Sequence, residues 1–307
     1  MKVELNYMEI GDIVVRKSYK KDITFKIIDI KQEQGREIYT LKGVNVRIIA
    51  DSPYEDLEEV SVATMTKKEE VFTSKVNDSI KKILDDRKFR GGDKGKHLNK
   101  KSKIEKMYRT NKNIKTKELY FGRPGKILHI DGDSEYLDTC LKVYKQLQLD
   151  VVGEKVLEKE QPDKILSLVK LYKPDIVVIT GHDAVLKEAE NYTDINNYRN
   201  SKYFVKTVGV LRDYERNYDD LIIFAGACQS CYEAILDAGA NYASSPGRVL
   251  IHCLDPVFLC EKIAYTNISN IVSIEDALEN TITGIKGIGG LQTRGKYREG
   301  FPKSEYV

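Results

Sequence analysis

The chain has 307 residues, with 50 Lys and Arg against 47 Asp and Glu, five Cys and no Trp. This length favours two domains, and five unevenly spaced cysteines do not form the disulfide framework of a small secreted protein. We expect no membrane partner, because no run approaches the ~20 apolar residues of a membrane helix and the amino terminus lacks a signal-peptide pattern. The net charge of +3 excludes a uniformly basic nucleic-acid binder.

The charge is unevenly distributed along the chain. Residues 64–118 contain 18 basic and 8 acidic side chains, a local net charge of +10, whereas the other 252 residues carry −7. A four-residue spacing of Phe72, Val76, Ile80 and Leu84 predicts a short helix in this stretch. No period continues beyond Gly91, which indicates a flexible linker. The few aromatic residues support sequence-independent attraction at most, so a nucleic-acid partner is not expected. We therefore divide the chain into residues 1–62, a linker at 63–120 and residues 121–307.

The first segment is rich in short β-branched or alternating runs, which predict strands. They lie at Ile13–Arg16, Ile23–Ile30, Ile38–Leu41 and Val46–Ala50. Several short strands in about 60 residues suggest a small SH3-like β-barrel, since closure removes exposed strand edges.

The last segment alternates apolar strands with helical patterns. Strands are predicted at Lys126–Ile130, Val151–Val152, Asp175–Thr180, Leu221–Ala225, Asn241–Ser244 and Val249–His252, and helices at Tyr136–Leu147, Ile165–Leu171, Tyr198–Tyr214 and Tyr232–Ala238. Continuous apolar strands are buried on both faces. The fold class is therefore α/β, a three-layer sandwich with a mostly parallel sheet and right-handed crossovers.

Two of the buried strands are followed by residues that can carry nucleophilic chemistry. His182 follows the strand at 175–180, and Cys228 follows the strand at 221–225. If the strands are parallel neighbours, both side chains emerge at the same edge of the sheet. A thiolate is a strong nucleophile and an imidazole can transfer its proton, so the pair predicts a cysteine peptidase dyad. The amides of Cys228 and of the Gly181–Asp183 turn are candidates for the oxyanion hole.

Other interpretations of these residues stay open. An isolated buried cysteine is commonly a small hydrophobe. Cys228 and Cys231 also form a Cys-x-x-Cys pair, which would suit a thiol–disulfide oxidoreductase but would leave His182 without a role. Cys253 and Cys260 lack the partners that a zinc site needs. We therefore expect neither a metal nor another cofactor.

The two strand ends resemble the catalytic blocks of caspase-like cysteine peptidases. The resemblance lies in Thr180-Gly181-His182 and in Ala227-Cys228, each after an apolar strand. In that group the histidine is usually followed by glycine, whereas Asp183 stands here. The resemblance implies a caspase-like fold for the last segment and puts the oxyanion donor at residue 183 in doubt.

The whole chain resembles the YabG family of sporulation-specific proteases of spore-forming Firmicutes. The similar stretches are Gly11–Tyr19, Val46–Ser52, Pro124–Asp133, Ile179–Asp183, Ile223–Ser230, Ala238–Pro246 and Leu254–Val257. The family implies cleavage of spore coat and germination proteins after Arg. It also implies a protein of the cytoplasm of the sporulating cell that associates with the spore coat. A non-enzymatic spore-coat scaffold remains an alternative.

Cleavage after Arg requires a carboxylate for the arginine side chain. Asp131 and Asp133, after the first strand of the sheet, and Asp255 are the candidates. The alternative roles are a turn for the first two and a helix cap for Asp255. An Arg-directed enzyme could also cut its own linker, because exposed segments are where proteolysis concentrates. The candidate self-cleavage residues there are Arg87, Arg90 and Arg109.

Overall fold

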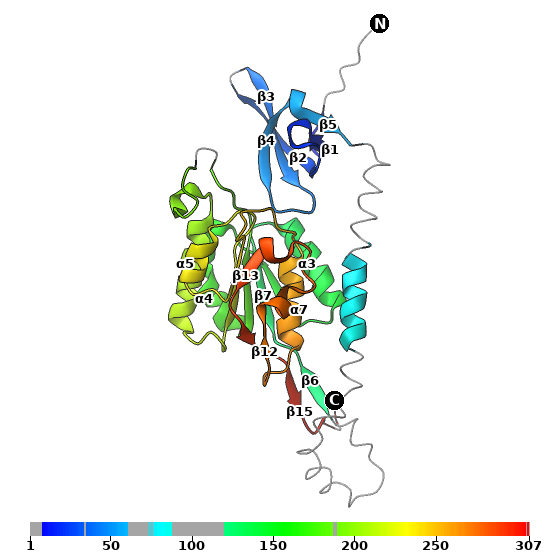
Figure 1. The fold of residues 1–307 in the computed structure, drawn as a ribbon, viewed down its shortest axis with the longest axis vertical. Helices are drawn as coiled ribbons and strands as arrows, with labels where there is room; N and C mark the ends of the chain where they lie inside the picture. The colour runs from blue at the N-terminus through cyan, green and yellow to red at the C-terminus, as the bar shows by residue number, and fades with distance from the viewer. Residues whose placement is uncertain are drawn as a thin grey trace, which may run out of the picture.

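The computed structural model describes residues 8–33, 35–60, 74, 76–87, 120–186, 189–304 and 306. It has two sheets, and Figure 1 shows the amino-terminal sheet seated above one end of the larger one. The chain is a mixed α/β protein with a mostly parallel large sheet, as predicted. The assignments to an SH3-like barrel and to a caspase-like sandwich remain predictions.

The amino-terminal sheet has five antiparallel strands in the order β4-β3-β2-β1-β5. Its strands are β1 (Ile13–Arg16), β2 (Thr24–Glu33), β3 (Arg36–Gly43), β4 (Ile49–Pro53) and β5 (Leu57–Glu59). Alternate residues point into a small core that holds Val14, Phe25, Ile27, Tyr39, Leu41 and Leu57. This alternation is the period of two that the sequence displays.

The predicted strand at Val46–Ala50 is wrong at its start. The β4 strand begins only at Ile49, and residues 44–48 form a loop after β3. Val46 instead makes an antiparallel bridge with His252 of the second unit. A contact so distant in the sequence has no local signature, so the β-branched residues alone suggested a continuous strand.

The larger sheet has the order β13-β11-β10-β9-β7-β8, in which all pairs are parallel except β11 with β13. Its strands are β7 (Ile127–Asp131), β8 (Val151–Lys155), β9 (Ile176–Thr180), β10 (Ile222–Ala225), β11 (Tyr242–Ser244) and β13 (Ile288–Gly290). The helices are α3 (Ser134–Gln146), α4 (Gln161–Tyr172), α5 (Ser201–Tyr214), α6 (Tyr232–Asp237), α7 (Asp255–Tyr265) and α8 (Ile274–Leu278).

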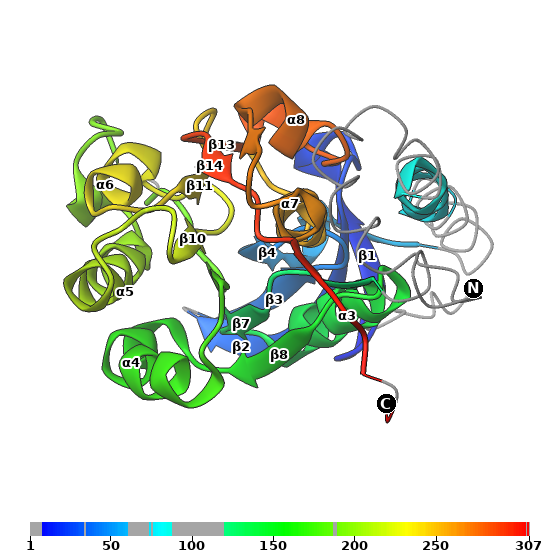
Figure 2. The ribbon, with the colours of Figure 1, turned by 90° about the horizontal axis from the view of Figure 1, so that it is seen from below.

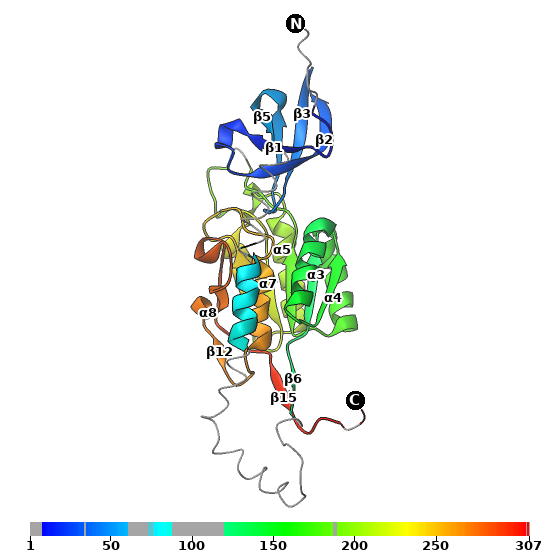
Figure 3. The ribbon, with the colours of Figure 1, turned by 90° about the vertical axis from the view of Figure 1, so that its right-hand side faces the viewer.

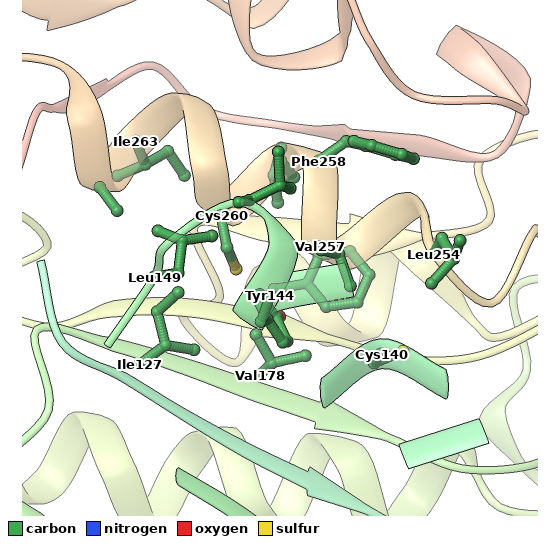
Figure 4. Packing of buried hydrophobic residues seen from close by; sticks show 14 of the residues in the cluster. Ile127, Cys140, Tyr144, Leu149, Val178, Leu254, Val257, Phe258, Cys260 and Ile263 are labelled. Atoms are coloured by element: carbon green, nitrogen blue, oxygen red, sulfur yellow. The ribbon is translucent and has the colours of Figure 1, made fainter. Parts of the chain in front are cut away.

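Helices cover both faces of this sheet (Figure 2). One core packs Ile176 and Val178 of β9 with residues of α3 and α7, and Figure 4 shows this side. The other packs Val177 and Ile179 with residues of α4 and α5. The strands are continuously apolar because both faces are buried.

Smaller elements complete the described chain. They are the pairs β12 (Ile271–Val272) with β14 (Thr293–Arg294) and β6 (Phe121–Arg123) with β15 (Arg298–Gly300), and the 3-10 turns Lys17–Tyr19, Tyr54–Asp56, Glu158–Glu160, Ile195–Asn197 and Gly284–Lys286. The predicted strand at Val249–His252 is wrong, because its only ladder contact is the isolated bridge of His252.

The helix predicted around Val76, Ile80 and Leu84 is confirmed over residues 76–87. Val76, Ile80 and Ile83 are buried in the core that also contains α7 residues, and Figure 3 shows this helix beside α7. Phe72 and residues 88–119 lie outside the described part of the chain. Within the described part, no helix combines the length and apolarity that crossing a membrane requires.

Candidate active site

The site lies where the order of the parallel strands reverses. From β7 the chain moves outward to β8 and then returns to β9 on the other side of β7. Such a reversal leaves a crevice at the carboxyl ends of the two inner strands. The β9 and β10 strands are parallel neighbours, as predicted, so the loops that carry His182 and Cys228 lie at the same edge of the sheet.

The imidazole of His182 is held by a carboxylate. Its Nε2 lies 2.9 Å from Oδ2 of Asp133, the residue that also caps the amino terminus of α3. Partial burial acts to raise the pKa of Asp133, but hydrogen bonds from His182 and from Lys42 outweigh it and hold the pKa well below its usual range. Nδ1 of His182 is buried and has no hydrogen-bond partner. The ring therefore has one nitrogen fixed and one nitrogen left for a reacting group.

Cys228 lies in a tight, fully buried turn before α6. Its Sγ accepts a hydrogen bond from the amide of Ile251 at 3.2 Å. The turn needs positive φ angles at Gly226 (111°) and Gln229 (55°), and a Cβ on Gly226 would lie 2.7 Å from Ser244 Oγ. Burial raises the pKa of the Cys228 thiol to about 12, although the hydrogen bond from the amide of Ile251 and the charge of Arg47 act to lower it.

A single carboxylate ties the two loops together. Asp183 accepts hydrogen bonds from Ser201 Oγ of α5 and, at 2.9 Å, from Ser230 Oγ. Ser230 Oγ in turn accepts the amide of Ala227 at 2.9 Å. Burial raises the pKa of Asp183 in spite of these bonds. Asp183 thus links the turn after β9, the turn after β10 and α5.

The amides proposed for the oxyanion hole have close neighbours. The amide of His182 donates to Glu158 Oε1 at 2.6 Å, and a Cβ on Gly181 would lie 2.2 Å from that same oxygen. Glu158 therefore orients this turn. The roles of the Gly181, Asp183 and Cys228 amides as oxyanion donors remain predictions.

An arginine of the amino-terminal unit is buried among residues of the second unit. Arg47 is completely buried, and its guanidinium donates to Asp131, to the Cys253 carbonyl at 3.5 Å and to Cys140 Sγ at 3.6 Å. Burial would raise the pKa of Asp131, but the charge of Arg47 lowers it to about 2. Asp131 and the Cys253 carbonyl therefore both bind the guanidinium of Arg47.

The three candidate aspartates occupy different environments. Asp131 binds Arg47, whereas Asp133 binds His182 and Lys42. Asp255 is buried at the start of α7 and accepts the amides of Ile282, Thr283 and His252. Burial raises the pKa of Asp255. Within the part of the chain that the structure describes, Asp131 is the one of the three that contacts a guanidinium.

The remaining predicted residues lie elsewhere or outside the described chain. Arg87 pairs with Glu261 at 2.7 Å and stacks on Tyr265, so it is held against the folded unit. Arg90 and Arg109 lie outside the described residues.

The Cys-x-x-Cys pair is not arranged as one unit. Sγ of Cys228 faces residue 251, whereas that of Cys231 contacts the carbonyl oxygen of Thr193 at 3.9 Å. Both thiols are free. No group of three or more metal-ligating side chains occurs within the described ranges.

Sequence patterns did not predict four residues of the candidate site, which are Lys42, Arg47, Tyr136 and Glu158. The hydroxyl of Tyr136 contacts the carbonyl oxygens of Gly43 and Val46. One signal was available, since Arg47 is a charge within an apolar β-branched run that the strand prediction would place in or beside a core. Nothing in the sequence indicates that this run reaches the second unit.

Comparison with known proteins identifies the family of the chain. The profile of the family described as YabG peptidase U57 matches residues 9–302. The sporulation-specific protease YabG of Bacillus subtilis (strain 168) is 43% identical over 295 residues, which cover 96% of this chain and 98% of that protein. The chain therefore belongs to the YabG family of sporulation-specific peptidases.

Proposed function

We propose that this peptidase is a cysteine endopeptidase that cleaves spore proteins after arginine. Cys228 attacks the scissile carbonyl carbon, and His182 accepts the thiol proton and later protonates the leaving amine. Asp133 orients the imidazole through Nε2. The amides of Cys228 and of the Gly181–Asp183 turn are the proposed oxyanion donors.

The observation that carries this proposal is the buried pair of Arg47 and Asp131 at the carboxyl end of β7. A guanidinium seated between a carboxylate and a carbonyl oxygen is the arrangement that an arginine-binding subsite requires. We therefore propose Asp131 as the carboxylate of the P1 pocket. Asp133 and Asp255 are no longer needed for that role, because each is engaged in the bonds described above.

A cleft beside this pocket offers room for a peptide chain. It has a volume of about 1100 Å³ and lies between the amino-terminal sheet and the loops after β9 and β10. Its walls include Ile48, Ile49 and Ala50 on one side and Val185 and Gln229 on the other. We propose that residues on the carboxyl side of the scissile bond lie in this cleft.

We further propose that the substrates are spore coat and germination proteins and that the enzyme acts in the sporulating cell, associating with the spore coat. The family membership supports the sporulation setting. Self-processing belongs to the same proposal, with Arg90 and Arg109 as linker candidates. Arg87 is a poor candidate, because its side chain is paired with Glu261.

The test is cleavage of a coat-protein extract by purified enzyme, with the cut sites mapped by mass spectrometry. Cys228→Ala and His182→Ala should each abolish cleavage, and Cys231→Ala should not. Cuts should follow arginine. Full activity of Cys228→Ala would disprove the mechanism, and equal loss in Cys231→Ala would favour the thiol–disulfide alternative.

A further inference from the structure

The segment Asn45–Ile48 of the amino-terminal unit lies in the candidate active site as a peptide substrate would. Val46 pairs antiparallel with His252, and the amide of Cys253 donates to the carbonyl of Asn45 at 3.2 Å. Peptides are commonly bound in this way, by main-chain pairing with an exposed edge.

The side chain of the next residue then enters the arginine pocket. Arg47 is 0% exposed, and its guanidinium meets Asp131 and the Cys253 carbonyl. The hydroxyl of Tyr136 also holds the backbone, through the carbonyl oxygens of Gly43 and Val46. Main chain and side chain are therefore both bound.

The proposed nucleophile contacts the segment that pairs with this loop. Cys228 Sγ accepts the amide of Ile251 at 3.2 Å, and Ile251 precedes His252, the residue that pairs with Val46. Arg47 directly follows Val46, and its guanidinium contacts the carbonyl of Cys253, the residue after His252. The bond that follows is the one between Arg47 and Ile48.

We propose that Arg47 is the P1 residue of an internal substrate and that the peptidase cleaves its own Arg47–Ile48 bond in cis. This inference rests on the proposed function, because it uses the same nucleophile and the same arginine pocket. It adds a self-cleavage site in the loop between β3 and β4 to the sites proposed in the linker.

The step balances with water as the second reactant. The Cys228 sulfur bonds to the Arg47 carbonyl carbon, the bond to the Ile48 nitrogen breaks, and His182 delivers the thiol proton to that nitrogen. Water then hydrolyses the thioester, which releases the Arg47 carboxylate and restores the thiol. Until then the loop fills the pocket and Cys228 is 0% exposed, so the uncut chain is closed to other substrates.

Cleavage would free residues 44–47 to leave the pocket, because the uncut loop is held at both ends and the cut loop at one. Gly43 is the last residue of β3, and Ile49 is the first of β4. The amide of Gly43 bonds to the Ile48 carbonyl at 2.9 Å, and the amide of Ile48 bonds to the Val46 carbonyl at 2.8 Å. After the cut, residues 44–47 are tethered through β3 alone and can leave the pocket.

The test follows the intact mass of freshly purified wild type and Cys228→Ala under denaturing conditions. Wild type should yield two pieces that end at Arg47 and begin at Ile48, and Cys228→Ala should stay whole at this bond. Arg47→Gln should abolish the cut, whereas Arg36→Gln, at an exposed arginine of β3, should leave it unchanged.

Two further measurements separate the outcomes. The rate constant of cleavage at the Arg47–Ile48 bond should not change over a tenfold range of protein concentration. Wild type should not cut added Cys228→Ala at this bond, because in that variant the bond is buried in the variant's own site. Cutting of that variant at Arg47 would overturn the inference.

A short fluorogenic peptide amide ending in Arg tests the proposed function separately. Turnover of this peptide by a wild type that stays whole at Arg47 would overturn the inference alone, and no turnover with no self-cleavage would overturn both.

Discussion

Nζ of Lys42 lies 2.7 Å from Oδ2 of Asp133, the same oxygen that binds His182. The amino-terminal sheet therefore places a cation on the carboxylate that orients the imidazole. It also supplies Arg47 to the pocket of Asp131. Through both contacts the first unit contributes to the candidate site.

Replacing Asp133 with Asn should lower kcat/KM for an arginine peptide by roughly 10²-fold, within the range attributed to acid–base catalysis. Asn can still cap α3, but it does not hold the imidazole with a charge. Asp138→Asn, at an exposed position of α3, is the matched control and should be neutral. An unchanged rate in Asp133→Asn would contradict the orienting role.

The effects of changing Arg47 and Asp131 on the unfolding free energy should be strongly coupled. We expect this in a Cys228→Ala background, where the chain stays whole. Asp131→Asn leaves the Arg47 charge buried without its partner and should cost about 3–5 kcal/mol of unfolding free energy. The double change Arg47→Met with Asp131→Leu should cost much less. Urea unfolding measures both, and a simple sum of the single effects would argue against the coupling.

Acid should weaken the ion pair between Arg47 and Asp131 at a pH where the chain is still folded. The pKa of Asp131 is about 2 in the folded state and about 3.9 in an unfolded chain. Its contribution is therefore present above pH 4 and is lost as the pH falls from 4 to 2, by roughly 2 kcal/mol. Urea unfolding at pH 5.5 and 2.5 should show a smaller acid effect in the double variant. Equal acid effects would contradict this assignment.

Gly226→Ala should destabilise the fold by about 1–3 kcal/mol, because the residue has a φ of 111° and a Cβ would meet Ser244 Oγ. Gly209→Ala is the matched control within α5, where a Cβ meets nothing within 4 Å. That change should stabilise by about 0.5–1 kcal/mol. Thermal unfolding measures both effects. A melting temperature of Gly226→Ala equal to or above that of Gly209→Ala would contradict the prediction.

The thiol of Cys228 should react slowly with external reagents in the uncut chain, because it is fully buried. Its pKa of about 12 leaves roughly 10³-fold less thiolate at pH 8 than an ordinary cysteine has. Iodoacetamide labelling of His182→Ala, followed by peptide mapping, should show slow modification of Cys228 in the folded state and rapid modification in urea. Labelling at the rate of a free thiol in the folded state would contradict a closed site.

Local patterns predicted the part of the site that belongs to the large sheet. Apolar runs before His182 and Cys228 indicated buried parallel strands, and the neighbouring position of these strands is confirmed. Strand ends could be predicted because strand and helix periods are short-range properties of the chain.

The contribution of the amino-terminal unit could not be predicted in this way. Arg47 meets Asp131 across 84 residues and Cys253 across 206. Its β-branched neighbours suggest a strand, and only the three-dimensional packing shows that the loop leaves the sheet. Single-sequence patterns do not encode such contacts, so they do not predict that Arg47 binds Asp131.

The pairing of β3 with β4 has a practical consequence for detecting a nicked molecule. The two strands share five paired positions, from Ile38 with Pro53 to Lys42 with Ile49. A break between residues 47 and 48 therefore leaves both pieces joined by a hydrogen-bonded ladder and a common core. Gel filtration would report one particle of unchanged size, so preparations judged homogeneous by that method can still consist entirely of two-chain molecules.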